Sequence, residues 1–226
     1  MNELCVVFDI DDTLYLERTY VSSGFRAAGQ WAAEWLLIPD FDRHCIRLFD
    51  EGYRGNIFDA ALGACDYPSN PELIAGLVAI YRGHKPDIHM IEDAAVAIAN
   101  IRSVWPVAII TDGPVVSQSR KCEELDLANL ADPIVLTGTR GAGFHKPQRG
   151  AFEFVGSRIP ARRYVYVADN PAKDFTAPAE LGWHSIRIRR AGGLHYGVES
   201  GPALPEFELP NCTTLNSLLI HISGRK

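Results

Sequence analysis

Short runs of apolar residues recur along the chain and are separated by longer stretches with helical spacing. Most runs are nearly continuous in apolar residues, which is typical of strands that are covered on both faces in a parallel sheet. They predict strands at 4–9, 106–112, 133–138, 163–169 and 184–189. In and just after the last run, Arg187, Arg189 and Arg190 alternate with isoleucine, and this pattern predicts a strand with one solvated face.

The stretches between these runs predict helices at 91–102, 115–127, 149–159 and 172–182. The last of them ends on Gly182, a residue that commonly stops a helix. Strand and helix therefore alternate, which indicates an α/β protein with a doubly wound, Rossmann-like parallel sheet. Glycine and proline punctuate residues 192–210, which we expect to be irregular before a short helix near 214–222.

One connection is much longer than a crossover requires. Nearly a hundred residues separate the first two predicted strands, and they contain amphipathic patterns such as 23–37 and 71–84. A crossover needs one helix, so the surplus predicts an inserted α-helical domain. We expect a core formed by residues 1–16 and 88–226 and a helical insert formed by residues 17–87.

Acidic residues collect where the predicted strands end. In an open parallel sheet ligands bind at the carboxyl ends of the strands, so these acids are expected to converge. Carboxylates that lie close together repel one another, and a cation would offset the repulsion. Hard Mg²⁺ prefers such oxygen ligands, and the candidates are Asp9, Asp11, Asp169 and Asp174.

A magnesium site of this kind also suits a phosphate group, because Mg²⁺ is commonly shared between carboxylates and phosphate oxygens. Lys146 follows the third predicted strand and can supply a positive charge at the same edge of the sheet. Thr111 offers a hydroxyl and a backbone N–H at the end of the second strand. Both residues are suitable donors to phosphoryl oxygens.

Composition narrows the class of protein. The chain has 226 residues, of which 47% are apolar and 22% charged, as in soluble globular proteins. Its net charge of −6 argues against a nucleic-acid partner, and we expect no membrane partner because no basic run or long apolar window is present. Five dispersed cysteines without a Cys-x-x-Cys pair, and the lack of a signal-like start, predict a cytoplasmic protein with reduced thiols and no zinc.

Four stretches in order, from residue 6 to about 175, resemble the four motifs of the haloacid dehalogenase (HAD) superfamily. They are "FDIDDTLY", "ITDG", the lysine of "HKPQRGAF" and "VADNPAKDF". Ala168 stands where the last motif often has glycine, which is a small change. The helical insert after "DDTLY" resembles the C1 type of cap, which closes over the site and excludes bulk water.

The resemblance implies a role for each core residue. Asp9 would be the nucleophile that forms an aspartyl-phosphate, and Asp11 would protonate the leaving alcohol and then activate water. Thr111 and Lys146 would hold the phosphoryl group. The paired acids Asp9 and Asp11 favour phosphate-ester chemistry, because the dehalogenases of the superfamily lack the second acid.

The resemblance also implies how the cation is held. Asp169, Asp9 and the main-chain carbonyl of Asp11 would bind Mg²⁺, and Asp174 would support the metal or its water ligands. Asn170 could orient Asp169 or donate to substrate.

Several neighbouring residues have simpler explanations. Asp12 is expected to accept hydrogen bonds from local backbone N–H groups, as acids at turns commonly do. Asp112, with Gly113, is expected to shape the turn after the second strand, and Asp112 is also a candidate substrate contact. His145 could shuttle a proton, but Asp11 already fills that role, so a loop histidine is the simpler interpretation.

Substrate selection is expected to depend on the helical insert. Arg54 and Asn56, in the glycine-flanked "GYRGNIF", are candidate substrate-binding residues, and Arg54 could pair with a second anionic group. The alternative is a glycine turn with a solvated arginine. Arg18 and Tyr20 are weaker candidates of the same kind. Trp31 and Trp35 are four residues apart on one helix face and are predicted to lie in the core of the insert.

The function predicted from the sequence is a Mg²⁺-dependent phosphatase acting on a small phosphomonoester such as a sugar phosphate, a nucleotide or a similar metabolite. A phosphomutase is the alternative with the same chemistry, because it would return the phosphoryl group to its substrate. A phospho-aspartate signalling module, similar to response-regulator receivers, and a binding protein without activity are alternatives of other classes.

Overall fold

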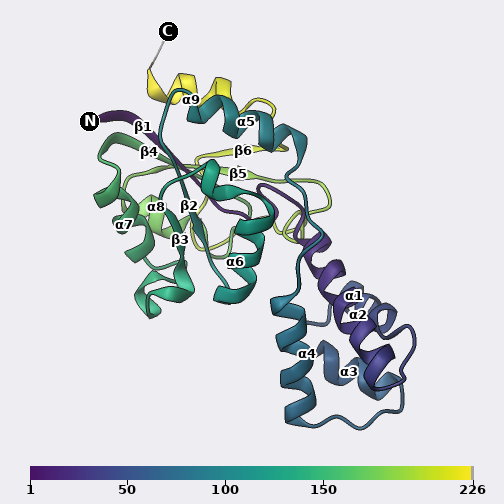
Figure 1. The fold of residues 1–226 in the computed structure, drawn as a ribbon. Coiled ribbons are helices and arrows are strands. Elements are labelled where there is room, and N and C mark those ends of the chain that lie inside the picture. Colours follow the sequence, from purple (N-terminus) through teal and green to yellow (C-terminus); the bar gives the residue numbers. More distant parts are fainter. Residues whose placement is uncertain (225–226) are drawn as a thin grey trace. The chain divides into compact units, whose positions relative to one another are not determined.

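Six parallel strands form one sheet, flanked by helices, in the computed structural model, which describes residues 1–224 (Figure 1). The strand order is β3-β2-β1-β4-β5-β6, and the predicted doubly wound α/β fold is confirmed. The strands are β1 (Asn2–Phe8), β2 (Val107–Thr111), β3 (Ile134–Leu136), β4 (Ala161–Ala168), β5 (His184–Ile188) and β6 (Phe207–Leu209).

The strand order reverses beside β1. From β1 the chain continues to β2 and β3 on one side, and β4, β5 and β6 follow on the other. The β1–β4 ladder runs from Asn2 opposite Ala161 to Phe8 opposite Val167. Residues that follow β1 and β4 therefore emerge together at the reversal point, where open α/β sheets bind ligands.

Both faces of the sheet are covered, which explains the continuous apolar runs in the sequence. On one face, Cys5 and Val7 of β1 pack in a cluster with Phe152 and Val155. Alternate residues of a strand point to the opposite face, and β1 is buried there as well. The core helices are α5 (Glu92–Arg102), α6 (Val115–Glu124), α7 (Gly150–Arg158), α8 (Thr176–Glu180) and α9 (Leu215–Ser223), with short 3₁₀ helices at Leu127–Asn129, Thr137–Thr139 and Ala142–Phe144.

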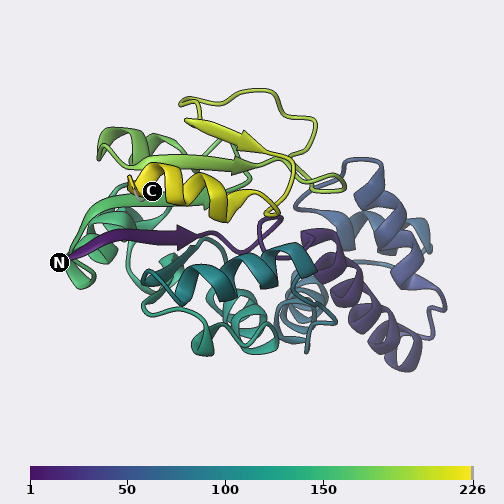
Figure 2. The ribbon, with the colours of Figure 1, turned by 90° about the horizontal axis from the view of Figure 1, so that it is seen from above.

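Two features of the C-terminal half differ from the prediction. Residues Phe207–Leu209 were expected to be irregular, but they form β6, pairing from Ile186 opposite Phe207 to Ile188 opposite Leu209. Three residues are too few to show an alternating pattern, so the strand conformation of β6 depends on its pairing with β5. The predicted helix at 172–182 is shorter, because the residues before Thr176 form turns. Figure 2 shows the short yellow strand β6 beside β5.

The prediction of a solvated arginine face on β5 is wrong. Arg187 is only 1% exposed. Its Nε donates to the Asp169 carbonyl at 3.1 Å, and its Nη2 donates to the carbonyls of His195 and Val198 at 2.8 and 2.7 Å. Five fixed N–H donors let one guanidinium satisfy several carbonyls, so Arg187 anchors the loop after β5 to the residue that ends β4.

The chain divides into two compact units, Met1–Glu17 with Ile88–Lys226 and Arg18–Asp87. The first contains the sheet. The second is helical and comprises the part of α1 (Glu17–Trp35) after Glu17, α2 (Phe41–Asp50), α3 (Ile57–Ala64) and α4 (Pro71–Gly83). The expected boundaries after residues 16 and 87 lie within one residue of this division, and the proposed cap role of the helical unit stays a prediction.

Aromatic rings form the core of the helical unit. The Phe25 ring centroid lies 5.3 Å from that of Tyr81 and 5.9 Å from that of Phe58. Gly24 allows this packing, since a Cβ there would lie 2.6 Å from the Tyr81 ring. The predicted core position of Trp35 is wrong, because its side chain is 70% exposed at the end of α1.

No helix among residues 1–224 is long and apolar enough to cross a membrane.

Candidate active site

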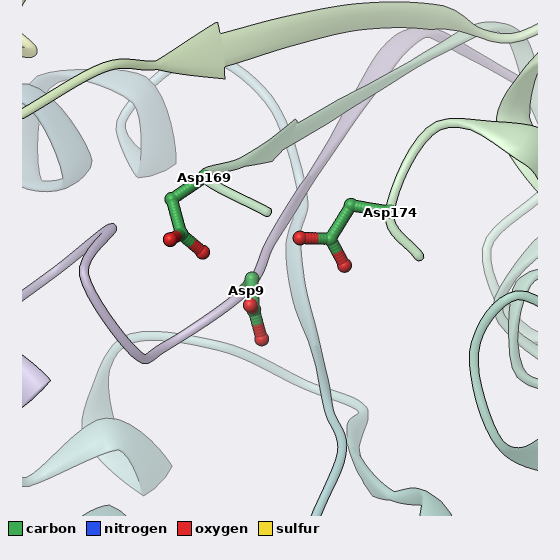
Figure 3. A group of neighbouring side chains, drawn as sticks. All are labelled: Asp9, Asp169 and Asp174. Carbon is green, nitrogen blue, oxygen red and sulfur yellow. The ribbon is translucent and has the colours of Figure 1, made fainter. Parts of the chain in front are cut away.

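Three carboxylates meet where the strand order reverses. Asp9 follows β1, Asp169 follows β4, and Asp174 belongs to the turns before α8. Their oxygens lie within 4.8 Å of one another, and Figure 3 shows the side chains converging from these segments. All three are buried, with exposures of 3%, 6% and 0%. The predicted convergence of distant acids at one edge of the sheet is therefore observed for these residues.

The electrostatics of this group favour a bound cation. Burial raises the pKa of Asp9 to about 6, with the Asp174 charge adding to the rise and Lys146 opposing it. Burial and the charges of Asp174 and Asp9 raise the pKa of Asp169 well above its ordinary value. Neighbouring like charges and desolvation both disfavour ionised carboxylates, and a hard divalent ion relieves both. The donor set therefore fits Mg²⁺.

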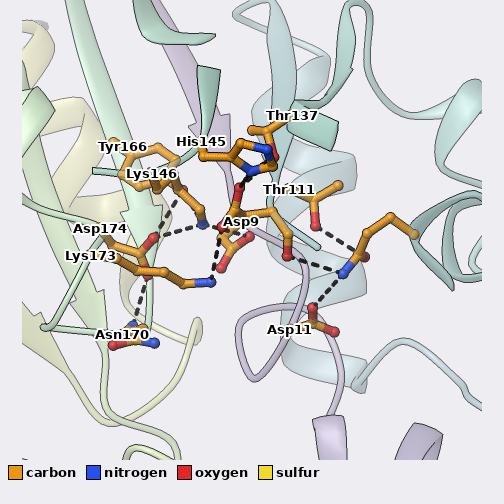
Figure 4. Close-up of polar contacts among 12 residues, drawn as sticks. Asp9, Asp11, Thr111, Thr137, His145, Lys146, Tyr166, Asn170, Lys173 and Asp174 are labelled. Atoms are coloured by element: carbon orange, nitrogen blue, oxygen red, sulfur yellow. Dashed lines mark hydrogen bonds and ion pairs between the residues drawn. The ribbon is translucent and has the colours of Figure 1, made fainter. Parts of the chain in front are cut away.

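Lys146 lies between two of these acids. Its Nζ is 3.1 Å from Asp9 Oδ1 and 2.7 Å from Asp174 Oδ1, and it donates to the Tyr166 hydroxyl at 3.0 Å (Figure 4). Burial alone would lower the pKa of Lys146, but Asp174 and Asp9 raise it well above its usual value. A charged ammonium group therefore lies beside the predicted nucleophile, where it can contact a transferred phosphoryl group.

A tight turn fixes Asp174. The Asn170 backbone N–H donates to Asp174 Oδ2 at 2.9 Å, and the Ala172 N–H donates to the Asn170 side-chain oxygen at 2.9 Å. Asn170 Nδ2 also lies 2.9 Å from His195 Nε2. Asn170 thus builds the turn that carries Asp174, and its predicted contact with Asp169 or with substrate stays a prediction.

Asp112 connects the loops after β2 and β3. It accepts a hydrogen bond from the Thr137 hydroxyl, and its Oδ1 lies 2.8 Å from His145 Nδ1. Burial would raise the pKa of Asp112, but the hydrogen bonds from Thr137 and His145 and the charge of Lys173 lower it. These contacts give Asp112 a structural role, and contact with substrate stays a prediction. His145 is a loop residue with a 46% exposed side chain.

Asp11 does not join the carboxylate group. Its Oδ1 accepts hydrogen bonds from Lys121 Nζ at 2.7 Å and from the Tyr15 hydroxyl. Its Oδ2 accepts one from Gln118 Nε2 at 3.1 Å. These donors hold its carboxylate toward α6, and its predicted place among the metal ligands stays a prediction. The predicted contribution of its main-chain carbonyl stays a prediction.

Thr111 is fully buried at the end of β2, where its hydroxyl donates to Gln118 Oε1 at 3.1 Å. Its predicted contact with a phosphoryl group stays a prediction. Asp12 has the structural role expected of it, because its oxygens accept from the backbone N–H groups of Glu17 at 2.8 Å and Leu194 at 2.6 Å.

The remaining candidates belong to the helical unit. Arg54 Nη1 donates to the carbonyls of Phe49 at 2.8 Å and Tyr53 at 2.7 Å, and the Arg54 guanidinium lies 3.9 Å from the centroid of the Phe49 ring. Asn56 is exposed and precedes α3 without a capping bond. Their predicted contacts with substrate stay predictions.

Arg18 and Tyr20 have structural explanations within the same unit. Arg18 forms two hydrogen bonds with Asp50, at 2.5 and 2.9 Å. Tyr20 is 3% exposed and packs edge-on against Tyr81, with the ring centroids 5.7 Å apart.

Sequence reasoning missed Gln118 and Lys121, which contact Asp11. The available signal was their spacing of three residues, which places them on one face of the helix after β2. A lysine on a helix face that packs against a sheet requires a buried partner, and a nearby acid is the natural one.

Solved structures with this fold include hydrolases of different chemistry. The HAD-hydrolase YfnB from Bacillus subtilis, bound to magnesium, matches with a TM-score of 0.67 and 18% identity, covering 99% of each chain. A 2-haloacid dehalogenase from Pseudomonas syringae matches with a TM-score of 0.66 and 20% identity, covering 98% of this chain and 100% of the other. These similarities show the HAD fold and do not separate its chemistries.

Sequence comparison finds relatives that share one named activity. No family model matches the chain. A glyceraldehyde 3-phosphate phosphatase from Methanocaldococcus jannaschii is 27% identical over 196 residues, which is 81% of this chain and 83% of the relative. A protein of the same name from Methanopyrus kandleri is 25% identical over 215 residues, or 90% of this chain and 91% of the relative.

The comparisons identify the fold of the chain and the named activity of its relatives. The fold of the chain is that of the haloacid dehalogenase hydrolases. The curated relatives that it resembles are named phosphatases.

Proposed function

We propose that this protein is a magnesium-dependent phosphatase of the haloacid dehalogenase superfamily, which hydrolyses a small phosphomonoester through an aspartyl-phosphate on Asp9. The observation that carries the proposal is the setting of Asp9, which is buried at the end of β1 between Lys146 and the acids Asp169 and Asp174. This setting supplies a nucleophilic carboxylate, a fixed positive charge and a cation site within one group of side chains.

The proposed reaction has two steps. An oxygen of Asp9 attacks phosphorus, the ester P–O bond breaks, and Asp11 gives a proton to the leaving alcohol oxygen. Asp11 then takes a proton from water, the water oxygen attacks phosphorus, and the bond to Asp9 breaks to release inorganic phosphate. Lys146 and Thr111 bind the phosphoryl oxygens during both transfers.

Magnesium fits this scheme as the resident cation. Asp9, Asp169 and Asp174 would hold it, and the bound ion would neutralise negative charge on the phosphoryl oxygens. Lys146 would stabilise the rest of the negative charge on the phosphoryl oxygens, and its ammonium is held in place by Asp174 and the Tyr166 hydroxyl.

The proposed substrate class is a small phosphorylated metabolite. The relatives named glyceraldehyde 3-phosphate phosphatase support a phosphate ester of a short carbon chain. Triose phosphates are therefore the first compounds to test, followed by other sugar phosphates and nucleotides.

The test measures inorganic phosphate release from such a panel, with Mg²⁺ or with EDTA. We expect metal-dependent release by the wild type and its loss in Asp9→Asn. The matched control is Asp59→Asn, which changes an exposed carboxylate of α3 and is expected to retain activity. Hydrolysis retained by a folded Asp9→Asn protein would refute Asp9 as the nucleophile.

Two other outcomes separate the alternatives. Labelling of Asp9 without phosphate release, together with return of the phosphoryl group to an acceptor alcohol, would indicate a phosphomutase. Stable labelling of Asp9 with no acceptor would indicate a phospho-aspartate signalling module.

A further inference from the structure

Helix α6 contributes two buried polar side chains to the carboxylate of Asp11. We propose that Lys121 and Gln118 are positioning residues, which hold Asp11 so that its Oδ2 exchanges the proton with the leaving oxygen. This inference rests on the proposed function, because it concerns the acid–base step of that reaction. It assigns a task to a helix that carries none of the four motif residues.

The charged side chain of Lys121 is buried, and burial of a charge costs free energy. Its side chain is 3% exposed, and its Nζ lies 2.7 Å from Asp11 Oδ1. The same ammonium lies 6.0 Å from the centroid of the Tyr15 ring. Burying a charged lysine is unfavourable unless a partner of opposite charge is fixed nearby. The pair therefore fixes the Asp11 carboxylate as firmly as it fixes the lysine.

Gln118 holds the other oxygen and links two predicted site residues. Its Nε2 donates to Asp11 Oδ2 at 3.1 Å, while its Oε1 accepts from the Thr111 hydroxyl at 3.1 Å. The amide must be oriented this way, because only its NH₂ group can donate to a carboxylate. Gly113 gives it room, since a Cβ there would lie 2.7 Å from Gln118 Nε2.

The donors leave one oxygen of Asp11 less occupied than the other. Among residues 1–224, Oδ1 accepts from Lys121 and from the Tyr15 hydroxyl, whereas Oδ2 accepts from Gln118 alone. Each carboxylate oxygen has about two acceptor sites, so Oδ2 retains one for a further partner. The Asp11 side chain is also 17% exposed, which leaves it accessible to substrate. These contacts assign proton transfer to Oδ2.

The test separates proton transfer from phosphoryl binding by the choice of leaving group. With enzyme in excess, alcohol release reports only the transfer to Asp9. An alkyl phosphate needs a proton on its leaving oxygen, whereas p-nitrophenyl phosphate departs readily without one. General acid catalysis contributes about 100-fold or more, so Lys121→Met should slow the alkyl ester by about 10- to 100-fold. We expect the aryl ester to slow by less than about threefold.

Four further comparisons control the experiment. Lys121→Arg keeps the charge and should recover part of the alkyl-ester rate, and Gln118→Leu should also slow the alkyl ester selectively. In an Asp11→Asn background, Lys121→Met should have no additional effect on the alkyl ester. Arg120→Met removes a half-exposed cation of the same helix, which pairs with Glu123 at 3.0 Å, and should leave both rates unchanged.

Equal slowing of both esters by Lys121→Met, or full additivity with Asp11→Asn, would overturn the inference. If the wild type hydrolyses no ester, the proposed function fails first, and thermal stability then tests the pair itself. A double-mutant cycle of Lys121→Met and Asp11→Asn should show shifts in melting temperature that do not add, as expected for residues in contact. Absence of coupling would overturn the pairing independently of activity.

Discussion

The environment of Asp169 disfavours the ionised form of its carboxylate. It is 6% exposed, and burial together with the charges of Asp174 and Asp9 raises its pKa well above the ordinary value. An ionised Asp169 therefore destabilises the folded protein unless a cation is bound. Such a conflict between stability and placement is common at functional sites.

The first prediction concerns Asp169→Asn in EDTA at neutral pH. We expect the variant to be more stable than the wild type, because the neutral amide removes a buried charge from a cluster of acids. Mg²⁺ should reverse the order, since a ligand at a hundred times its dissociation constant stabilises the native state by about 2.7 kcal/mol. Thermal melting with and without Mg²⁺ measures both effects, and a variant less stable than the wild type in EDTA would contradict the argument.

The placement of single residues was predictable from the sequence where a strand end fixed it, and not where distant partners did. Asp9 and Lys146 were expected at one edge of the sheet because each follows a strand that the apolar pattern marks, and they lie there together. The partners of Asp11 were not found, since Gln118 and Lys121 matter only once α6 packs beside the loop after β1. Arg187 was predicted to be solvated for the same reason. The carbonyls that accept its hydrogen bonds come from segments whose proximity the apolar pattern does not show.

At the scale of elements, one side chain ties α5 to two later segments. Asp93, in the first turn of α5, accepts from Arg190 Nη1 at 3.0 and 3.1 Å and from the Cys212 backbone N–H at 2.6 Å. Arg190 is 8% exposed, so it depends on this partner. Burial would raise the pKa of Asp93, but the bonds from Arg190 and Cys212 lower it.

The second prediction concerns Asp93→Asn. Its folded pKa lies below the ordinary value of 3.8, so the carboxylate stabilises the fold at pH values above that value. This stability is lost as pH falls through the folded pKa. We expect the variant to lose about 1–3 kcal/mol at pH about 7, because a buried donor loses a charged acceptor, and to differ less near pH about 3.

Urea unfolding at the two pH values measures this difference. Asp132→Asn, which changes an exposed aspartate before β3, is the control and should shift little at either pH. A loss that is the same at both pH values would show that packing of Asp93, rather than its charge, joins these elements.

At the scale of the whole molecule, the chain consists of two compact units. The residues that surround Asp9 all belong to the unit with the sheet, while Arg54 and Asn56 belong to the helical unit. We therefore expect changes in the helical unit to alter the choice of substrate more than the chemistry.

The third prediction concerns Arg54→Ala. We expect the KM for the preferred substrate to rise by about tenfold, since a hydrogen bond to a charged group contributes about 1.5 kcal/mol. The KM for p-nitrophenyl phosphate should change less, because that ester has no second anionic group. Arg43→Ala, at a residue with a 77% exposed side chain, is the control. Equal effects on both esters would leave Arg54 with only a structural role, through its contacts with Phe49 and Tyr53.

The overall architecture was largely predictable, because long apolar runs and the extra length between the first two strands are properties of the local sequence. The exceptions are short or context-dependent. β6 has three residues, and its pairing depends on β5 already being in place. The exposure of Trp35 depends on where α1 ends, which a periodic pattern alone does not fix.

The pairing of β1 with β4 also has a consequence for biosynthesis. β1 is made early and can join β2 and β3, but its second neighbour is made much later. Until β4 is in place, one edge of β1 has unpaired backbone groups, and an open edge of this kind promotes aggregation. Asp9 meets Asp169 only when that edge closes, so in the nascent chain the group of three carboxylates forms no earlier than the exposed edge of β1 is covered.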